Sequence, residues 1–344
     1  MTKTIGEAAE VVIKKATKRK PRTATRADFK LLDAGDSIFA EPATEKDAAY
    51  IARELVQCTL PHKNPPKDKT VWTRKNGNLT LAIQSGYNIK TGEHYGIPYG
   101  TAPRLVLFWI TTEAVRTKSR RLDLGSNLAG FMHELGLDPS RGGKRSDAKR
   151  LKEQMERLFR AKISFDRTTS RAYVNKKGEI EQHHGKAWLD MQVAPKGELW
   201  WDEKEPEQTT LWGSWIELGE DFYTSITAAP VPVDVRALKA LKKSPLALDL
   251  YAWLSHESYR AHKSGEGRFI SWSMLMEQLG TEYTDPKNFG TKAKAALRKV
   301  LVVYPALRLG DLRAGVRIDP QSFPAIKPRE QVTIEGKAEE IKDD

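Results

Sequence analysis

Residues 101–159 read TAPRLVLFWITTEAVRTKSRRLDLGSNLAGFMHELGLDPSRGGKRSDAKRLKEQMERLF, and the spacing of apolar residues in this stretch predicts three helices. Pro103 lies at the start of the first, and the apolar run 105–110 predicts that this helix is buried. Ser126 is placed to cap a short second helix that Gly136 ends. The third helix is longer and has one apolar side: Ala148, Leu151, Met155, Leu158 and Phe159. This is the order of a helix-turn-helix.

Strands are predicted after the third helix, because the apolar period changes between Lys162 and Val193. The tip of this segment, at residues 167–178, is basic and rich in turn-forming residues. A β-hairpin directly after a helix-turn-helix occupies the position of a wing. The sequence therefore predicts a winged-helix unit in the first half of the chain.

The same order of patterns returns in the second half. Ser244 and Pro245 begin a helix that corresponds to the one after Pro103. Ser271 caps a second helix that Gly280 ends, and a lysine-rich helix and a hairpin-like segment follow. Two copies of one module explain the repetition, so we predict an α+β fold with two tandem winged-helix domains.

Other elements are predicted before and between the modules. An apolar helical face predicts a helix from Glu45: Ala48, Ile51, Ala52, Leu55 and Val56. The Asn76-Gly77 pair predicts the turn of a hairpin. The prolines at 230 and 232 are expected to break the chain, and Asp234 to cap a short helix at 235–241 that joins the modules.

Both ends of the chain are expected to be flexible. Residues 14–30 are basic and lack apolar periodicity, as a solvated tail or a nonspecific phosphate clamp would be, and the residues after Pro328 are acidic and poor in apolar side chains. The predicted organisation has four parts: a flexible basic arm at 1–44, an N-terminal winged-helix domain with its preceding helix and hairpin at 45–229, a C-terminal winged-helix domain at 230–328, and a disordered tail at 329–344.

The charge of the chain favours a polyanionic partner, and nucleic acid above all. Its 344 residues include 57 basic and 45 acidic side chains, a net charge of +12. No stretch approaches the roughly 18 apolar residues of a membrane span, and no signal peptide is evident. We therefore expect a cytoplasmic protein without membrane contact.

No cofactor or metal is expected. The single cysteine, Cys58, excludes an internal disulfide and a multi-thiolate zinc site. The adjacent His183 and His184 would point to opposite faces of a strand, where they cannot readily chelate one ion.

The longer helix of each module has a basic or hydrogen-bonding side opposite its apolar side, as a helix in the major groove requires. Candidate DNA contacts in and before the first are Arg141, Lys144, Arg145, Ser146, Lys149, Arg150 and Arg157. Candidates in the second are Lys287, Asn288, Thr291, Lys292, Lys294, Arg298 and Lys299. The hairpins add side chains suited to hold phosphates: Arg167, Arg171, Lys176, Lys177, Arg313 and Arg317.

An ordinary solvated helix face is the alternative interpretation of both helices. Glu153 and Glu156 favour it for the first helix, because phosphates repel carboxylates. The tryptophans fall in apolar patterns, which indicates core packing rather than base stacking: Trp109, Trp212, Trp215 and Trp253.

The chain from about Tyr95 to Pro324 resembles the RepA family of plasmid replication initiators. The segment YGIPYGTAPRLVLFWITTEAVRTKSRRLDLGSNLAGFMHELGLDPSRGG looks like the family's signature, and the half from PVPVDVRALKALKKSPLALDLYAWLSHESYR through GTKAKAALRKVL is also similar. The resemblance implies binding to repeated origin sequences (iterons) in double-stranded DNA, opening of the nearby duplex, plasmid copy control and repression of the protein's own promoter. The partners it implies are the host initiator, the replicative helicase and a second copy in a homodimer.

Two classes of enzyme are disfavoured by the sequence. A nicking enzyme wants two histidines one residue apart on a strand, and the sequence has no His-x-His. A phosphate-binding loop is excluded because Arg145 follows Gly143-Lys144 and Asp138 stands where a glycine is needed. We therefore expect no enzyme. A transcriptional repressor on the same scaffold stays open, and a structural partitioning or packaging protein is a weaker alternative.

Overall fold

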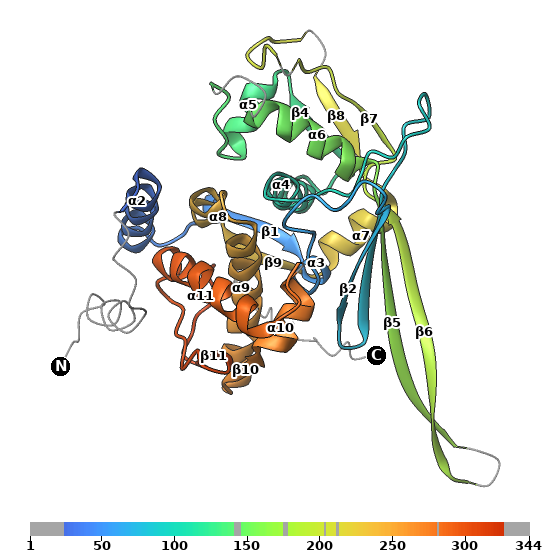
Figure 1. The fold of residues 1–344 in the computed structure, drawn as a ribbon, viewed down its shortest axis with the longest axis vertical. Helices are drawn as coiled ribbons and strands as arrows, with labels where there is room; N and C mark the ends of the chain where they lie inside the picture. Colours follow the sequence, from blue (N-terminus) through green and yellow to red (C-terminus); the bar gives the residue numbers. More distant parts are fainter. Residues whose placement is uncertain are drawn as a thin grey trace, which may run out of the picture.

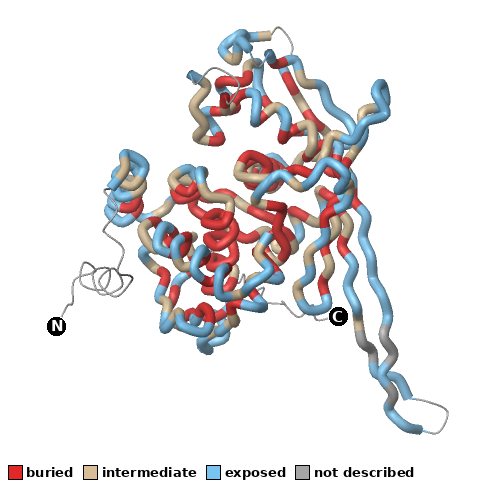
Figure 2. The backbone as a smooth tube through the Cα atoms, in the orientation of Figure 1, coloured by how far each residue is buried: buried red, intermediate tan, exposed pale blue. Residues whose placement is uncertain are grey.

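The computed structural model describes residues 24–140, 146–174, 178–202, 204–210, 213–280 and 282–326. Helices and antiparallel strands are mixed along the chain, so the fold is α/β in composition (Figure 1). The buried residues are concentrated in the helices and at the roots of the strands, whereas one long hairpin is exposed over most of its length (Figure 2).

The three helices of the opening stretch are confirmed, and their bounds follow the apolar pattern. The elements in order are α4 (Ala102–Thr117), β4 (Arg121–Gly125), α5 (Leu128–Glu134), α6 (Asp147–Phe159), β5 (Lys162–Val174) and β6 (Ile180–Gln192). The cap of α5 differs from the prediction of Ser126. Asn127 caps this helix instead, and its side-chain oxygen accepts a hydrogen bond from the Gly130 N–H at 2.7 Å.

The repeated order in the second half is confirmed as well. It comprises α9 (Pro245–Ser264), β10 (Arg268–Ser271), α10 (Trp272–Leu279), α11 (Pro286–Val303) and β11 (Gly315–Ile318). The predicted hairpin-like segment is reduced to one bridge between Leu309 and Ile318. The main partner of β11 is β10, which precedes the two helices, so the pairing closes around them.

The hairpin at Asn76-Gly77 is confirmed and belongs to a larger sheet. Strands β2 (Val71–Asn76) and β3 (Leu79–Gln84) join β5 and β6 in the order β2-β3-β5-β6. Gly77 has a φ of +56°, which favours glycine in the turn. A second sheet has the order β4-β8-β7, with β7 at Lys196–Glu198 and β8 at Ser214–Glu217.

The predicted helix from Glu45 is wrong. That segment forms a 3-10 turn η1 (Glu45–Asp47), strand β1 (Ala48–Ala52) and a short helix α3 (Arg53–Gln57). Strand β1 pairs with β9 (Pro230–Asp234), where the chain was predicted to break. A two-stranded sheet accommodates the prolines, because each strand keeps a free edge on which a missing N–H costs nothing.

A helix, α2 (Arg26–Ala40), occupies much of the segment that was predicted to be a flexible arm. Thr25 and Asp28 form a capping box at its start. Its Gly35 packs so closely on α11 that a Cβ would lie 2.5 Å from the Val302 carbonyl oxygen. Tertiary packing thus stabilises a helix whose own sequence gives only a weak signal. The remaining helices are α7 (Glu220–Ala228) and α8 (Val235–Leu241), and Asp234 caps α8 as expected.

The two halves are joined by a buried ion pair between α4 and α9. The Arg104 guanidinium donates to both carboxylate oxygens of Asp249 at 2.7 Å. It also donates to the carbonyls of Leu60, Pro61 and Gly100. Burial opposes ionisation of Asp249, but Arg104 and a hydrogen bond from His62 lower its pKa below the usual range.

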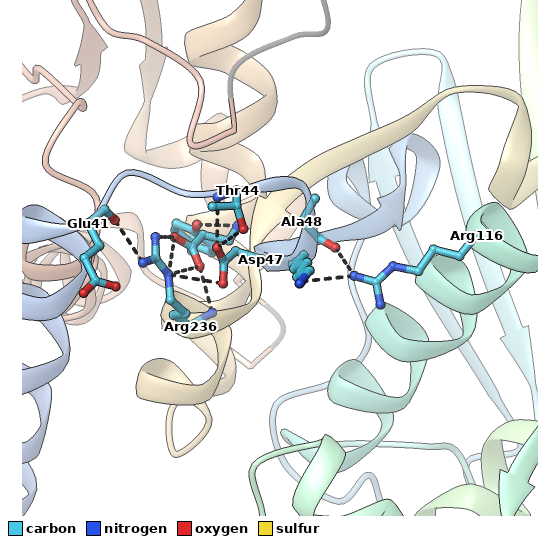
Figure 3. A network of polar contacts seen from close by, with 9 residues as sticks. Glu41, Thr44, Asp47, Ala48, Arg116 and Arg236 are labelled. Carbon is cyan, nitrogen blue, oxygen red and sulfur yellow. Dashed lines mark hydrogen bonds and ion pairs between the residues drawn. The ribbon is translucent and has the colours of Figure 1, made fainter.

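A second polar joint holds the segment that leads into β1 (Figure 3). Arg236 of α8 donates to the Glu41 carbonyl at 3.0 Å and to the Asp234 carboxylate at 2.7 Å. From the other side, Arg116 of α4 donates to the Ala48 carbonyl at 2.8 Å. Residues 41–48 are therefore fastened to one helix from each half.

Arg104→Met is expected to destabilise the protein by about 3–5 kcal/mol, because it leaves the Asp249 carboxylate buried without its cation. Urea unfolding measures the change. Arg104→Met combined with Asp249→Leu should recover much of the loss, since no unpaired charge remains. The control Arg53→Met removes a partly exposed pair with Glu54 and should cost under about 1 kcal/mol. An equal cost for both arginines would contradict a structural role for the buried pair.

Candidate nucleic-acid interface

Helix α11 presents a polar, basic face to solvent. Its apolar side is buried as predicted: Phe289, Ala293, Ala296, Leu297 and Val300. The exposed side carries most of the predicted DNA contacts in one stripe: Lys287, Asn288, Thr291, Lys292, Arg298 and Lys299. The helix contains no acidic residue, so nothing on its own surface would repel a phosphate.

The cations of this stripe are available for a ligand. Within the described part of the chain, Lys287, Lys292, Arg298 and Lys299 form no ion pair. The N-terminal end of the helix is held by Asp285, whose carboxylate accepts hydrogen bonds from the N–H groups of Lys287 and Asn288. Asn288 therefore stands in the first turn of α11. In a helix that binds the major groove, the first turn lies closest to the bases.

Trp272 positions α11 and the loop beside it. A Cβ at Gly290 would lie 3.1 Å from the indole ring, so glycine permits the close packing of α10 on α11. The indole N–H donates to the carbonyls of Leu312 and Arg313 at 3.3 Å. Lys294 is half-buried, whereas the other predicted contacts of the helix are exposed. Its ammonium group lies 5.5 Å from the centre of the Trp272 ring.

Strand β11 and the loop before it add two exposed arginines, Arg317 and Arg313. Arg313 donates to Asp311 and, through this hydrogen bond, lowers the pKa of that carboxyl. Arg317 lies opposite Phe269 in the ladder, with its guanidinium 5.4 Å from the ring centre. Arg308 is also exposed and was not singled out by the sequence, although it lies in the segment that was predicted to form a hairpin.

Helix α6 is a weaker candidate. Lys149 and Arg150 are exposed as predicted, but Arg150 lies 3.8 Å from the Asp147 carboxylate and Glu153 is exposed on the same helix. Ser146 is buried, and its hydroxyl accepts a hydrogen bond from the Lys149 N–H at 3.1 Å. Ser146 thus caps the helix rather than presenting its hydroxyl to solvent.

Arg157 is turned inward, which differs from its prediction as a DNA contact. Its guanidinium donates to Asn64 at 3.0 Å, to the Ile97 carbonyl at 3.1 Å and to Glu153 at 2.7 Å. It also lies 5.2 Å from the centre of the Tyr99 ring. These groups fasten α6 to the segment before α4. The sequence hides this role because all but one of the partners lie far away in the chain.

The hairpin β5-β6 extends well beyond the rest of the molecule (Figure 1). Strand β3 supports β5 only as far as Arg167, and beyond that residue the two strands pair with each other alone. Arg167 is exposed at this point, and Lys186, opposite Thr168, is an exposed cation that the sequence did not single out. The alternation of side chains between the two faces of β6 would have indicated that Lys186 is exposed.

Several predicted contacts lie outside the described residues: Arg141, Lys144, Arg145, Lys176 and Lys177. Arg171 is part of β5, and its side chain is likewise outside the description. The side chains of His183 and His184 also lie outside the description. None of the described helices combines the length and apolarity that crossing a membrane requires.

Comparison with known proteins gives one family and two solved structures. Residues 97–274, more than half of the chain, match the family described as plasmid encoded RepA protein. A crystal structure of a selenomethionine derivative of domains 2 and 3 of RctB is similar, with a TM-score of 0.46 and 13% identity over 78% of this chain and 96% of that chain. Another crystal structure of RctB domains 2–3 has a TM-score of 0.44 and 13% identity over 75% and 87%. No curated protein matches.

Arg157→Ala is expected to destabilise the protein by about 1–3 kcal/mol, since it leaves the part-buried Ile97 carbonyl without this donor and removes the contacts that hold α6 to the segment before α4. Arg150→Ala on the same helix should change stability by no more than about 0.5 kcal/mol. Urea unfolding of the two variants checks this. If both arginines proved equally dispensable, Arg157 would be a surface cation and its inward contacts would be incidental.

Proposed function

This chain belongs to the family of plasmid-encoded RepA proteins, and from that premise we propose that it is a replication initiator that binds repeated origin sequences in double-stranded DNA. The observation that carries the proposal is the exposed stripe on α11, which is basic, free of acids and unpaired within the described residues. Such a surface suits the major groove, where lysine and arginine bind guanine and asparagine binds adenine.

We further propose that each half contributes a winged-helix domain, with the division near residue 229. In the second, β10, α10, α11 and β11 supply the strand, the two helices and the wing. In the first, β4, α5, α6 and the β5-β6 hairpin follow the same order. Two reading helices on one chain would let one protein molecule cover one origin repeat, about two turns of the duplex.

The two halves would divide the work. Helix α11 carries five cations and no acid, whereas α6 carries Asp147, Glu153 and Glu156 among its cations. We therefore assign sequence recognition chiefly to α11. The exposed arginines Arg167, Arg313 and Arg317 would hold the phosphate backbone, which supplies affinity rather than specificity.

The remaining steps follow from initiation as the function. Opening of the adjacent duplex, recruitment of the host initiator and helicase, and repression of the protein's own promoter would all start from the DNA-bound form. None of these steps requires catalysis by this chain. A homodimer would be a second form of the protein, in exchange with the monomer.

Lys292→Ala combined with Lys299→Ala is expected to weaken binding to origin DNA and to reduce the salt slope by about 0.9 for each phosphate that the variant no longer neutralises. Fluorescence anisotropy at several salt concentrations measures both. Lys90→Ala, an exposed lysine in the loop before α4, is the matched control and should bind as the unmodified protein does. An unchanged slope in the α11 variant would remove that helix from the interface.

Origin opening separates an initiator from a repressor on the same scaffold. We expect the protein to make thymines beside the repeats of its own origin reactive to permanganate on a supercoiled plasmid, and the Lys292→Ala, Lys299→Ala variant to abolish this reactivity. Protection of the repeats without any reactive thymine, even with host initiator present, would favour the repressor.

A further inference from the structure

A cavity of about 260 Å³ lies between the β2-β3 hairpin and the second half of the chain. Its walls come from α3, β2, α9, α10 and the β10-β11 pair. A water molecule takes about 30 Å³ in the liquid, so the cavity is much larger than a structural water needs. None of the functions proposed above uses it.

Two nearly buried polar side chains line this cavity without a partner. Trp253 and Gln278 are 4% and 6% exposed, and neither side chain forms a hydrogen bond with a described residue. Some side-chain polar atoms elsewhere in the described chain are fully buried and have no hydrogen-bond partner. None of those atoms belongs to Trp253 or Gln278. Their polar groups therefore reach the space of the cavity. A ligand in the cavity would meet these groups with its own donors and acceptors.

The polar groups at the wall suit the edge of a nucleobase. Gln278 and the half-buried Gln57 each offer an amide with both donors and an acceptor, and the Trp253 indole adds a donor. Amide side chains pair with bases through such donor and acceptor pairs. Phe269 is 51% exposed at the same cavity and gives an aromatic face on which a base can stack.

Two arginines at the cavity suit a phosphate. Arg260 and Arg268 both donate to the buried carboxylate of Glu257, which also contacts His256 at 3.0 Å. Burial opposes ionisation of Glu257, yet the hydrogen bond from His256 and the two arginines lower its pKa to about 2. The carboxylate is thus ionised at neutral pH and holds both arginines in place. Each guanidinium has five N–H donors, so donors remain for an anion.

We propose that this cavity is a nucleotide-binding site, in which a base meets Gln57, Trp253 and Gln278 and its phosphate meets Arg260 and Arg268. The cavity lies beside the β10-β11 pair, where Arg317 faces Phe269. Two sources supply this chemistry: a free nucleotide, or an unpaired base in a DNA strand next to the bound duplex. The site is distinct from the α11 stripe and does not depend on duplex recognition.

Fluorescence of 2-aminopurine tests the proposal with the full-length protein. The probes are 2-aminopurine deoxyribonucleoside 5′-monophosphate, the same nucleoside without phosphate, and a single-stranded oligothymidylate with one 2-aminopurine. We expect the fluorescence of at least one phosphate-bearing probe to be quenched. Binding of the monophosphate assigns a free nucleotide, and binding of the oligonucleotide alone assigns an unpaired base in a strand. No saturable binding of either probe would overturn the proposal.

Variants locate the binding. Gln278→Leu, Phe269→Ala and Arg260→Gln should each weaken it by roughly tenfold, through removal of a hydrogen bond, a stacking face or a phosphate-binding cation. Only Arg260→Gln should also reduce the difference between nucleotide and nucleoside. The control Arg26→Gln, an exposed arginine on α2, should bind normally. Binding that none of the three variants changes would place the ligand elsewhere and refute the site.

Duplex binding is measured in parallel, so that this inference and the initiator function fail separately. Gln278→Leu should bind origin duplex normally, and Lys292→Ala with Lys299→Ala should bind the 2-aminopurine probes normally. Thermal unfolding checks that each variant folds. Should Gln278→Leu fail to fold, Phe269→Ala and Arg260→Gln still decide the question, because both positions are substantially exposed.

Discussion

The arrangement of this molecule depends on the ion pair between Arg104 and Asp249. Each residue stands in the first turns of a long buried helix, and these two helices occupy the same place in the two repeated modules. An unpaired charge at either position would be expensive in the interior, so the pair tolerates little freedom between α4 and α9. Because Arg104 also binds the carbonyls of the segment 60–61, the chain before the first module is fixed to the same point.

Helix α9 connects this joint with the candidate sites of the second half. Asp249 lies near its start, the Tyr251 hydroxyl accepts a hydrogen bond from the Asp234 N–H of β9, and Glu257 holds the arginines at the cavity. Helix α11, which carries the basic stripe, packs against α9 through its apolar side. A displacement of α9 would therefore move the Arg104–Asp249 joint, the cavity and helix α11 together. This gives a physical route by which events at one module can affect the other.

The two modules share an order of elements but differ in charge and in pairing. Strand β11 returns to β10 in a short two-stranded sheet, whereas β5 and β6 join the β2-β3 hairpin and then project from the body. The cations of α6 are partly neutralised by acids or drawn inward, as Arg157 is. Repetition of an architecture thus does not imply repetition of a function, since surface side chains vary without loss of the core.

The sequence by itself determined the local features. Apolar spacing and caps at Ser244, Ser271 and Asp234 predicted the helices, because these signals act over a few residues. The basic face of α11 could also be predicted from the sequence, since it depends only on the spacing of residues along a helix. Tertiary structure alone decided that residues 48–52 form a strand, whose partner is the distant segment 230–234. It likewise decided that Arg157 points inward, that Arg104 meets Asp249, and that Gln57, Trp253 and Gln278 share one cavity. Each of these depends on packing between segments far apart in the chain, and no local pattern encodes such packing.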